Sequence, residues 1–129
     1  MEHYFLIDHI RKNKRYSLTR LLNENRGQVT LGRLDNGATI EVGWEDGTLI
    51  DMTMDISRTH ATITATGDIP YITDGGSRGN SRHGTFVNGK RLTDAGHLLK
   101  NGDEIFLGEY YGPLETKVVD IPAKEHLTQ

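Results

Sequence analysis

Five Asn-Gly or Asp-Gly pairs punctuate this chain of 129 residues, and they limit what it can fold into. Both kinds of pair adopt the positive φ angles of tight turns at low cost, so they mark places where strands reverse direction. They are Asn36-Gly37, Asp46-Gly47, Asp74-Gly75, Asn88-Gly89 and Asn101-Gly102. Turns this frequent leave short segments between them, and short segments favour strands over long helices.

Between the turns, apolar and polar residues alternate with a period of two, as half-buried strands require. The apolar positions expected to face the core in residues 38–44 and 60–65 are Ile40, Val42, Trp44, Ala61, Ile63 and Ala65. Further strands are expected over residues 3–10, 15–22, 28–33, 70–74, 84–88, 104–108 and 116–121. Residues 17–24 and 93–100 also fit short helices on spacing alone. The whole pattern predicts an all-β sandwich or barrel.

The composition is that of one globular domain with enough apolar residues, 35%, to build a core. The net charge of −3 and the pI of about 6.0 give no global attraction to nucleic acid or to acidic membranes. The absence of cysteine excludes disulfides and thiolate chemistry. No apolar run is long enough to span a bilayer, and the N-terminal charges follow the apolar run, unlike those of a signal peptide. We expect a soluble, cytoplasmic protein.

The stretch GTFVNGKR, residues 84–91, matches seven of the eight positions of a phosphate-binding P-loop. Its last position is Arg91, where that motif needs Ser or Thr to hold magnesium, and no long helix pattern follows it. Two short strands around Asn88-Gly89 explain the same letters as a hairpin. We therefore expect no nucleotide site, and we expect Lys90 to lie in solvent just after the turn.

Catalytic, metal and nucleic-acid sites find little support. Ser57 and His60, with Asp55 nearby, superficially suggest a hydrolase, but no nucleophile elbow surrounds the serine. The six histidines are scattered without the spacing of metal ligands. The basic run over residues 11–15 lacks interleaved aromatic residues and is interpreted as the solvated turn of the first hairpin. We expect no enzyme, no cofactor and no metal site.

Four arginines lie beside predicted turns, next to Gly, Ser or His: Arg33, Arg58, Arg78 and Arg82. A guanidinium holds two phosphate oxygens at once and stays charged at every working pH. Loops rich in Gly, Ser and Arg are also common on protein surfaces, with their charges merely solvated. Spacing alone leaves both interpretations open.

Four sequence blocks, taken in order, resemble the forkhead-associated (FHA) domain family. They are VTLGR at 29–33, DISRTHATI at 55–63, YITDGG followed by SRHGTFVNGKRL at 71–92, and LLKNGDEIFLG at 98–108. The resemblance implies an eleven-stranded β-sandwich of two twisted, mainly antiparallel sheets, whose loops at one end bind phosphothreonine peptides. With its flanking strands the domain would span residues 3–121, followed by a loose tail or the start of a linker over 122–129.

The resemblance also implies roles for single residues. Arg33 would engage the phosphate and the Ser57 hydroxyl would donate to it, while Arg58 would add a second contact. Arg82 and His83 precede Gly-Thr, where the second position, usually Asn, holds the peptide backbone. Residues expected to support the binding loops are Gly32, His60, Gly84, Thr85, Asn88 and Gly89.

Three features depart from the family pattern. His83 replaces the commoner Asn. The segment 34–56 is long and carries Glu41, Glu45, Asp46, Asp51 and Asp55, which would repel phosphate if they lined the site; a loop projecting sideways is expected instead. Residues 75–80 look like an insertion, interpreted as a flexible loop in preference to one that brings Arg78 to the ligand.

The expected function is recognition of a phosphothreonine segment on a partner protein, a substrate of a Ser/Thr kinase, without turnover. Neither nucleic acid nor membrane is an expected partner, and the oligomeric state stays open. A scaffold sandwich that assembles without phosphate is the alternative. Arg33 together with Ser57 discriminates between the two, because a scaffold has no need of both.

Overall fold

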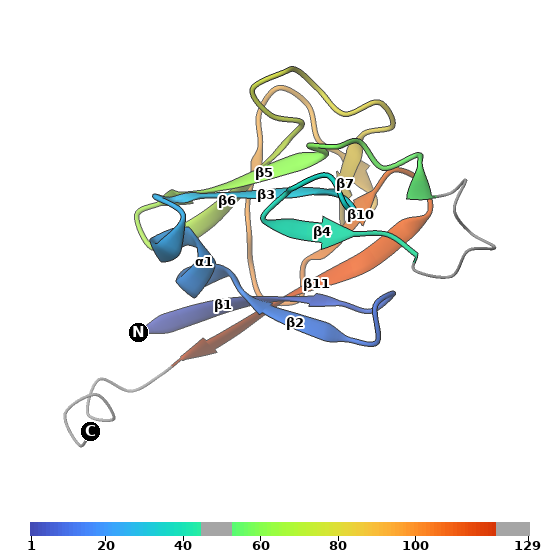
Figure 1. The fold of residues 1–129 in the computed structure, drawn as a ribbon. Helices are drawn as coiled ribbons and strands as arrows, with labels where there is room; N and C mark the ends of the chain where they lie inside the picture. Colours follow the sequence, from blue (N-terminus) through green and yellow to red (C-terminus); the bar gives the residue numbers. More distant parts are fainter. Residues whose placement is uncertain (45–52, 121–129) are drawn as a thin grey trace.

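Two β-sheets packed face to face form the body of the protein, as Figure 1 shows for the computed structural model, which describes residues 1–44 and 53–120. The strands and the helix are β1 (Glu2–Asp8), β2 (Lys14–Ser17), α1 (Leu18–Glu24), β3 (Gln28–Arg33), β4 (Ile40–Val42), β5 (Ala61–Thr66), β6 (Ile69–Asp74), β7 (Thr85–Val87), β8 (Lys90–Arg91), β9 (His97–Leu98), β10 (Glu104–Leu107) and β11 (Tyr111–Asp120). One sheet has the order β2-β1-β11-β10-β7-β8 and the other β4-β3-β5-β6-β9. The predicted all-β sandwich is confirmed.

The core lies between the two sheets and is built by the predicted alternation. Leu6, Ile105 and Leu114 of the six-stranded sheet are fully buried, as are Ile63 and Ile72 of the other sheet. Burial of each such side chain contributes about 1.5–3 kcal/mol. All pairings in the described part are antiparallel except that of β3 with β4, which is parallel.

The segment that fitted both a strand and a helix divides between them. Residues 14–17 form β2, and α1 begins directly after Ser17, whose Oγ accepts a hydrogen bond from the Arg20 amide at 3.1 Å. Leu18 and Leu22, four positions apart, bury one face of the helix. The predicted strand over 15–22 is therefore wrong from Leu18 onward, because the serine cap favours a helix start. No helix among the described residues is long and apolar enough to cross a membrane.

Of the four Asn-Gly and Asp-Gly pairs in the described residues, one joins two paired antiparallel strands. Asn88 and Gly89, with φ of 52° and 81°, connect β7 to β8 as predicted, and Lys90 is exposed. Asn36-Gly37 instead links the parallel pair β3 and β4. Asp74-Gly75 and Asn101-Gly102 lie where the chain passes from one sheet to the other. These pairs make turns, but the turn residues alone do not determine whether the two strands that they connect pair with each other.

Other differences lie at strand ends. Strand β11 begins at Tyr111, five residues before the predicted start. Gly112 and Pro113 disfavour a strand, so the sequence pattern does not reveal this early part of β11. Ala65 was predicted to face the core but is exposed, because it lies near the end of β5, beyond the part of the strand that covers the core. The pair Asp46-Gly47 and the predicted tail over 122–129 lie outside the described residues, so the domain boundaries stay predictions.

His60 ties the two sheets together at one end of the sandwich. Its side chain is fully buried just before β5, where Nδ1 accepts a hydrogen bond from the Ser57 amide at 3.1 Å. Nε2 lies 2.7 Å from the Gly84 carbonyl, directly before β7 of the other sheet. An amide only donates, so Nδ1 carries no hydrogen and Nε2 donates. These two bonds suit the neutral ring. Burial disfavours its charged form and lowers the pKa of His60.

The His60 contacts predict a loss of stability on acidification. The pKa of His60 is lowered in the folded protein, so its contribution is complete above the unfolded pKa of about 6.5 and is lost as pH falls through the folded pKa. The loss amounts to about 1.4 kcal/mol for each unit by which the pKa is lowered. Urea unfolding between pH 7.5 and 5 measures it. The variant His60→Gln, which keeps an acceptor and a donor but does not titrate, should show a flatter profile; an equally steep profile would contradict the assignment.

The β7–β8 hairpin supplies a second prediction. Asn88 Nδ2 donates to Asp103 Oδ1 at 2.9 Å and its Oδ1 accepts from the Glu104 amide at 3.0 Å. Asn88→Ala removes both bonds at a position with positive φ, so we expect a loss of about 2 kcal/mol in the free energy of unfolding. Lys90→Ala, two residues on and exposed, should change it by less than about 0.5 kcal/mol. Equal effects of the two variants in urea titrations would refute this explanation of the turn.

Candidate functional site

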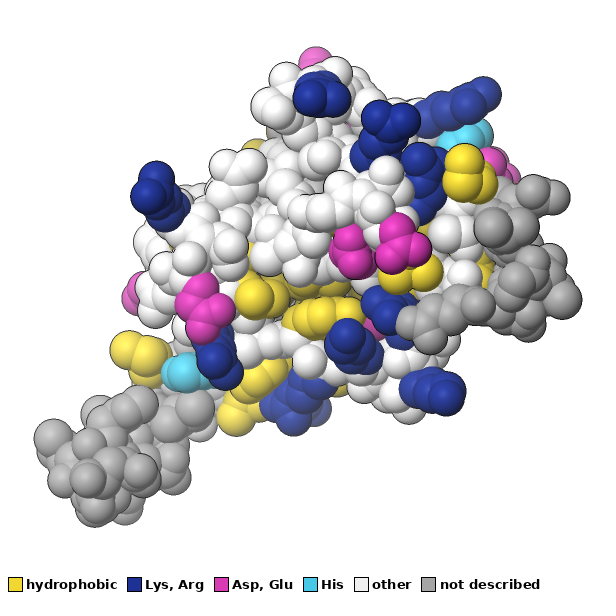
Figure 2. Space-filling view, in the orientation of Figure 1, with side chains coloured by type: hydrophobic (Ala, Val, Ile, Leu, Met, Phe, Trp, Pro, Cys, Tyr) yellow, Lys and Arg dark blue, Asp and Glu magenta, His cyan; other side chains and the backbone are white. Residues whose placement is uncertain are grey.

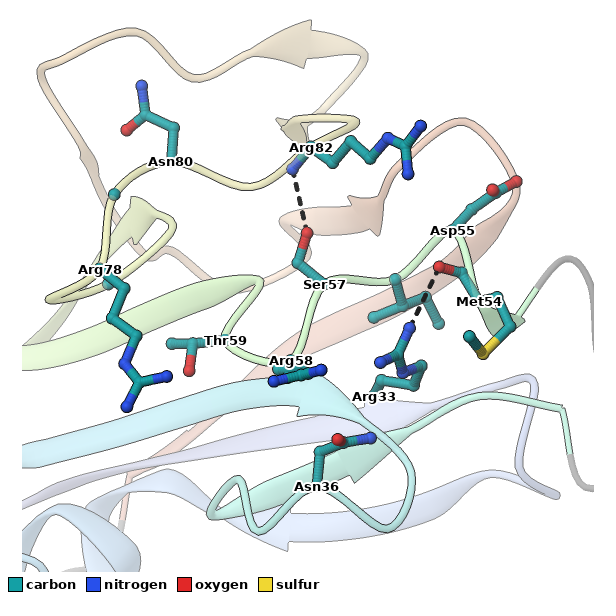
Figure 3. Close-up of a pocket in the computed structure, with 13 residues that line it drawn as sticks. Arg33, Asn36, Met54, Asp55, Ser57, Arg58, Thr59, Arg78, Asn80 and Arg82 are labelled. Atoms are coloured by element: carbon teal, nitrogen blue, oxygen red, sulfur yellow. Dashed lines mark hydrogen bonds between the residues drawn. The ribbon is translucent and has the colours of Figure 1, made fainter.

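Three segments meet at one end of the sandwich and enclose a pocket of about 740 Å³ (Figure 3). They are the end of β3 with the turn that follows it, the segment before β5, and the segment between β6 and β7. The lining residues are Arg33, Asn36, Met54, Asp55, Ile56, Ser57, Arg58, Thr59, Gly76, Arg78, Gly79, Asn80 and Arg82. Four of the five residues predicted to contact a ligand therefore come together here from distant parts of the sequence.

Ser57 holds the other two segments in place and keeps a donor for a ligand. Its carbonyl accepts the Arg33 amide at 3.1 Å and its Oγ accepts the Arg82 amide at 3.0 Å. Because Oγ is the acceptor in the second bond, its own hydroxyl hydrogen remains available to donate. A hydroxyl donor fixed by backbone amides in this way is suited to an oxyanion.

Gly32 allows β3 to come close to the segment that carries Ser57. A Cβ atom at this position would collide with the Arg58 carbonyl oxygen, so only glycine permits the approach. The next residue, Arg33, enters the pocket, where its Nη1 lies 3.4 Å from the Met54 carbonyl oxygen. This long contact leaves the guanidinium fork largely free for other acceptors.

Positive charge dominates the pocket. No ion pair involves Arg33, Arg58, Arg78 or Arg82 within residues 1–44 and 53–120. Dark blue side chains of Lys and Arg gather at the upper right of Figure 2, over the end of the sandwich that carries these loops. Unpaired guanidinium groups in one concave surface attract anions, and phosphate matches their planar fork.

A network around Asp74 fixes the segment that carries Arg82 and His83. Ser81 donates to Asp74 from its Oγ at 2.5 Å and from its amide at 3.1 Å, and Thr85 Oγ1 donates to the same carboxylate at 2.7 Å. Ser81 Oγ in turn accepts the Gly84 amide at 2.8 Å. Asp74 and Ser81 were not among the residues predicted from the sequence. No local pattern pairs them, because Asp74 ends β6 and Ser81 lies in the loop that follows.

His83 lies beside the pocket and does not line it. Its Nε2 is 3.6 Å from Oδ1 of Asp55, which does line the pocket. Of the acids in the long segment 34–56, Glu41 lies away from the pocket and accepts the Gly37 amide at 2.9 Å. Glu45, Asp46 and Asp51 lie outside the described residues.

The insertion at residues 75–80 forms a defined turn instead of the flexible loop that we expected. Gly76 and Gly79 exchange two backbone hydrogen bonds, at 2.9 and 3.0 Å, around a tip of two residues. The tip places Arg78 in the pocket lining. The signal in the sequence was the pair of glycines on either side of Ser77 and Arg78, which fits a two-residue turn.

The geometry separates the Ser57 hydroxyl from the His60 imidazole. His60 Nδ1 accepts the backbone amide of Ser57 and Nε2 is directed to the Gly84 carbonyl, so neither nitrogen is available to the Ser57 hydroxyl. Among the described residues, no group of three His, Asp or Glu side chains is arranged to hold a metal ion. The lining residues present hydrogen-bond donors and positive charge to a ligand.

Comparison with solved structures shows the same fold in FHA domains. The chain is similar to an FHA domain of a hypothetical protein from Arabidopsis thaliana, with 24% identity, a TM-score of 0.68, and coverage of 95% of this chain and 91% of that one. EmbR of Mycobacterium tuberculosis, solved with a low-affinity phosphopeptide, matches at 22% identity and TM-score 0.63 over 93% of this chain but 25% of its own.

A third structure is the yeast Dun1 FHA domain in complex with a doubly phosphorylated peptide, at 22% identity and TM-score 0.57, over 95% of this chain and 79% of that one. No curated protein matched the sequence. The family model described as FHA domain matches residues 29–108, which is more than half of the chain and includes every predicted site residue. The chain belongs to the FHA domain family.

Proposed function

We propose that this protein recognises a phosphothreonine-containing segment of a partner protein. The observation that carries the proposal is the meeting of Arg33, Arg58 and Arg82 in one pocket with the Ser57 hydroxyl, whose hydrogen is left available. A phosphothreonine carries about −1.5 to −2 charges and three acceptor oxygens near neutral pH. A guanidinium fork, a hydroxyl and further cations supply the matching donors.

Each of the five predicted contact residues then has a distinct part. Arg33 engages the phosphate, the Ser57 hydroxyl donates to one of its oxygens, and Arg58 adds a second cationic contact. The amide of Arg82 is used by Ser57, so Arg82 acts through its guanidinium. His83, at the edge of the pocket beside Asp55, holds the peptide backbone next to the phosphothreonine.

The fold neighbours support this proposal through their own complexes. EmbR was solved with a phosphopeptide and the Dun1 FHA domain with a phosphothreonine peptide. In this chain the loops are fixed in place before any ligand arrives, by His60, Ser57 and the Asp74 network. Loops that are already ordered lose less conformational entropy on binding, which favours affinity.

We further propose that recognition occurs without turnover, because neither nitrogen of His60 is available to the Ser57 hydroxyl. The module extends over residues 3–121, followed by a tail or linker at 122–129. Its ligand is written by a Ser/Thr kinase and is met inside the cell, so we place the protein in the cytoplasm.

A peptide-library measurement tests this function. Fluorescence anisotropy with matched peptides containing phosphothreonine, phosphoserine or unmodified threonine should show binding that depends on the phosphate. Arg33→Ala should weaken the binding of the phosphothreonine peptide by about tenfold or more, because a charge-assisted bond contributes about 1.5–3 kcal/mol. Arg33→Lys should recover part of the loss, since it restores the charge but not the fork.

Two exposed cations serve as controls. Lys90→Ala and Arg20→Ala remove positive charge outside the pocket lining, so they should leave the affinity nearly unchanged. Equal binding of all three peptides, or full affinity in Arg33→Ala, would overturn the proposal. That outcome would favour a scaffold that assembles without phosphate.

A further inference from the structure

The pocket holds more positive charge than one phosphate needs. Among the described lining residues, four arginines stand against the single carboxylate of Asp55, an excess of three positive charges. A phosphothreonine neutralises at most about two of them. Within the described residues, no carboxylate pairs with any of the four guanidinium groups. By this count over the described residues, one cation has no counterion when the proposed ligand is bound.

The position of Arg78 identifies it as that cation. Figure 3 shows Arg78 and Thr59 on one side of the pocket and Arg33, Met54 and Asp55 on the other, with Arg58 between them. Arg78 is thus separated from the end where Arg33 and Asp55 lie. A ligand phosphate held between Arg33 and Ser57 leaves the Arg78 side for another part of the same peptide.

The turn that carries Arg78 is anchored to strand β5. The Gly75 amide donates to the His60 carbonyl at 2.7 Å, and Thr62 Oγ1 donates to the Gly75 carbonyl, also at 2.7 Å. Gly76 lies against Thr59, where an added Cβ would be 2.6 Å from the threonine methyl carbon. The base of the turn is therefore fixed by the same histidine that positions Ser57, although its tip is exposed. Asn80, the last residue of the insertion, adds a neutral polar group to this side of the pocket.

We propose that Arg78 forms a second anion subsite, which selects partner segments carrying another negative group near the phosphothreonine. The group is a carboxylate side chain or a second phosphate, because both present coplanar or clustered oxygens to a guanidinium. This inference rests on the proposed function and adds a specificity residue to it. The insertion at 75–80 is thereby a device for choosing among phosphorylated partners.

Single substitutions in a phosphothreonine peptide test the subsite. Each position from four before to four after the phosphothreonine is changed to Asp, to phosphothreonine or to Ala, and affinities are measured by anisotropy. At one or more positions Asp should strengthen binding about two- to fivefold relative to Ala. A second phosphothreonine there should strengthen it about tenfold, because bidentate charge-assisted bonds are stronger. Comparison of the two series distinguishes the source of the anion.

The ratio of the Ala-peptide to the acid-peptide dissociation constant is the readout for Arg78. In Arg78→Ala this ratio should fall to about one, whereas Arg20→Ala should preserve it. Arg20 is a matched control because it lies on α1 and pairs with Glu24 at 2.7 Å, outside the pocket lining. Thermal unfolding of both variants checks that the fold is retained. The ratio should also shrink at 1 M salt, where exposed charges are screened.

Two results would count against the inference in different ways. If phosphothreonine peptides bind but no position shows an acid preference, or the preference survives in Arg78→Ala, the second subsite is refuted and the proposed function stands. If no phosphothreonine peptide binds the unmodified protein, the proposed function fails and the subsite fails with it.

Discussion

The buried imidazole of His60 is the contact on which the functional end of this sandwich depends. It accepts the Ser57 amide on one side and donates to the Gly84 carbonyl on the other, so one neutral ring joins loops that belong to different sheets. Its own backbone contributes as well, because the His60 carbonyl accepts the Gly75 amide at 2.7 Å. His60 thus joins the segment before β5 to the segment between β6 and β7, and its amide also donates to the Leu31 carbonyl of β3 at 2.7 Å. The end of β3 is held in addition by Ser57, whose carbonyl accepts the Arg33 amide.

This arrangement resolves a conflict between stability and binding. Clustered guanidinium groups repel one another and would disperse if their loops were free, at a cost in affinity when a ligand gathers them again. Here neutral hydrogen bonds and the half-buried carboxylate network of Asp74 hold the backbone, so the arginine side chains need no pairing with each other or with acids. The positive charge is then free to act on a ligand. Unpaired arginines are a consequence of loops fixed by other means.

The sequence predicted the parts of the molecule that depend on local pattern. The alternation at Ile40 and Val42, the Asn88-Gly89 hairpin and the exposure of Lys90 all follow from rules that act over a few residues. Contacts between segments that are distant in the sequence were harder to predict. Asn36-Gly37 makes a turn but leads to a parallel neighbour, and the Asp74–Ser81 pair becomes visible only when the two chain segments are brought together. The family resemblance singled out Arg33 and Ser57, yet it gave no account of Arg78, which lies in the segment 75–80 that departs from the family pattern.

The stretch GTFVNGKR shows why letters alone misplace a phosphate site. In a P-loop the backbone amides of such a stretch would face the ligand and a helix would follow. Here the Gly84 amide donates to Ser81 Oγ, while the Gly84 carbonyl accepts both His60 Nε2 and the Gly108 amide. The polar groups of Gly84 are therefore consumed in fixing the fold, and Asn88 is bound to Asp103 and Glu104. Donors to the proposed phosphate must come from elsewhere, and the candidates are the side chains that line the pocket on three loops, which this stretch helps to fix in place.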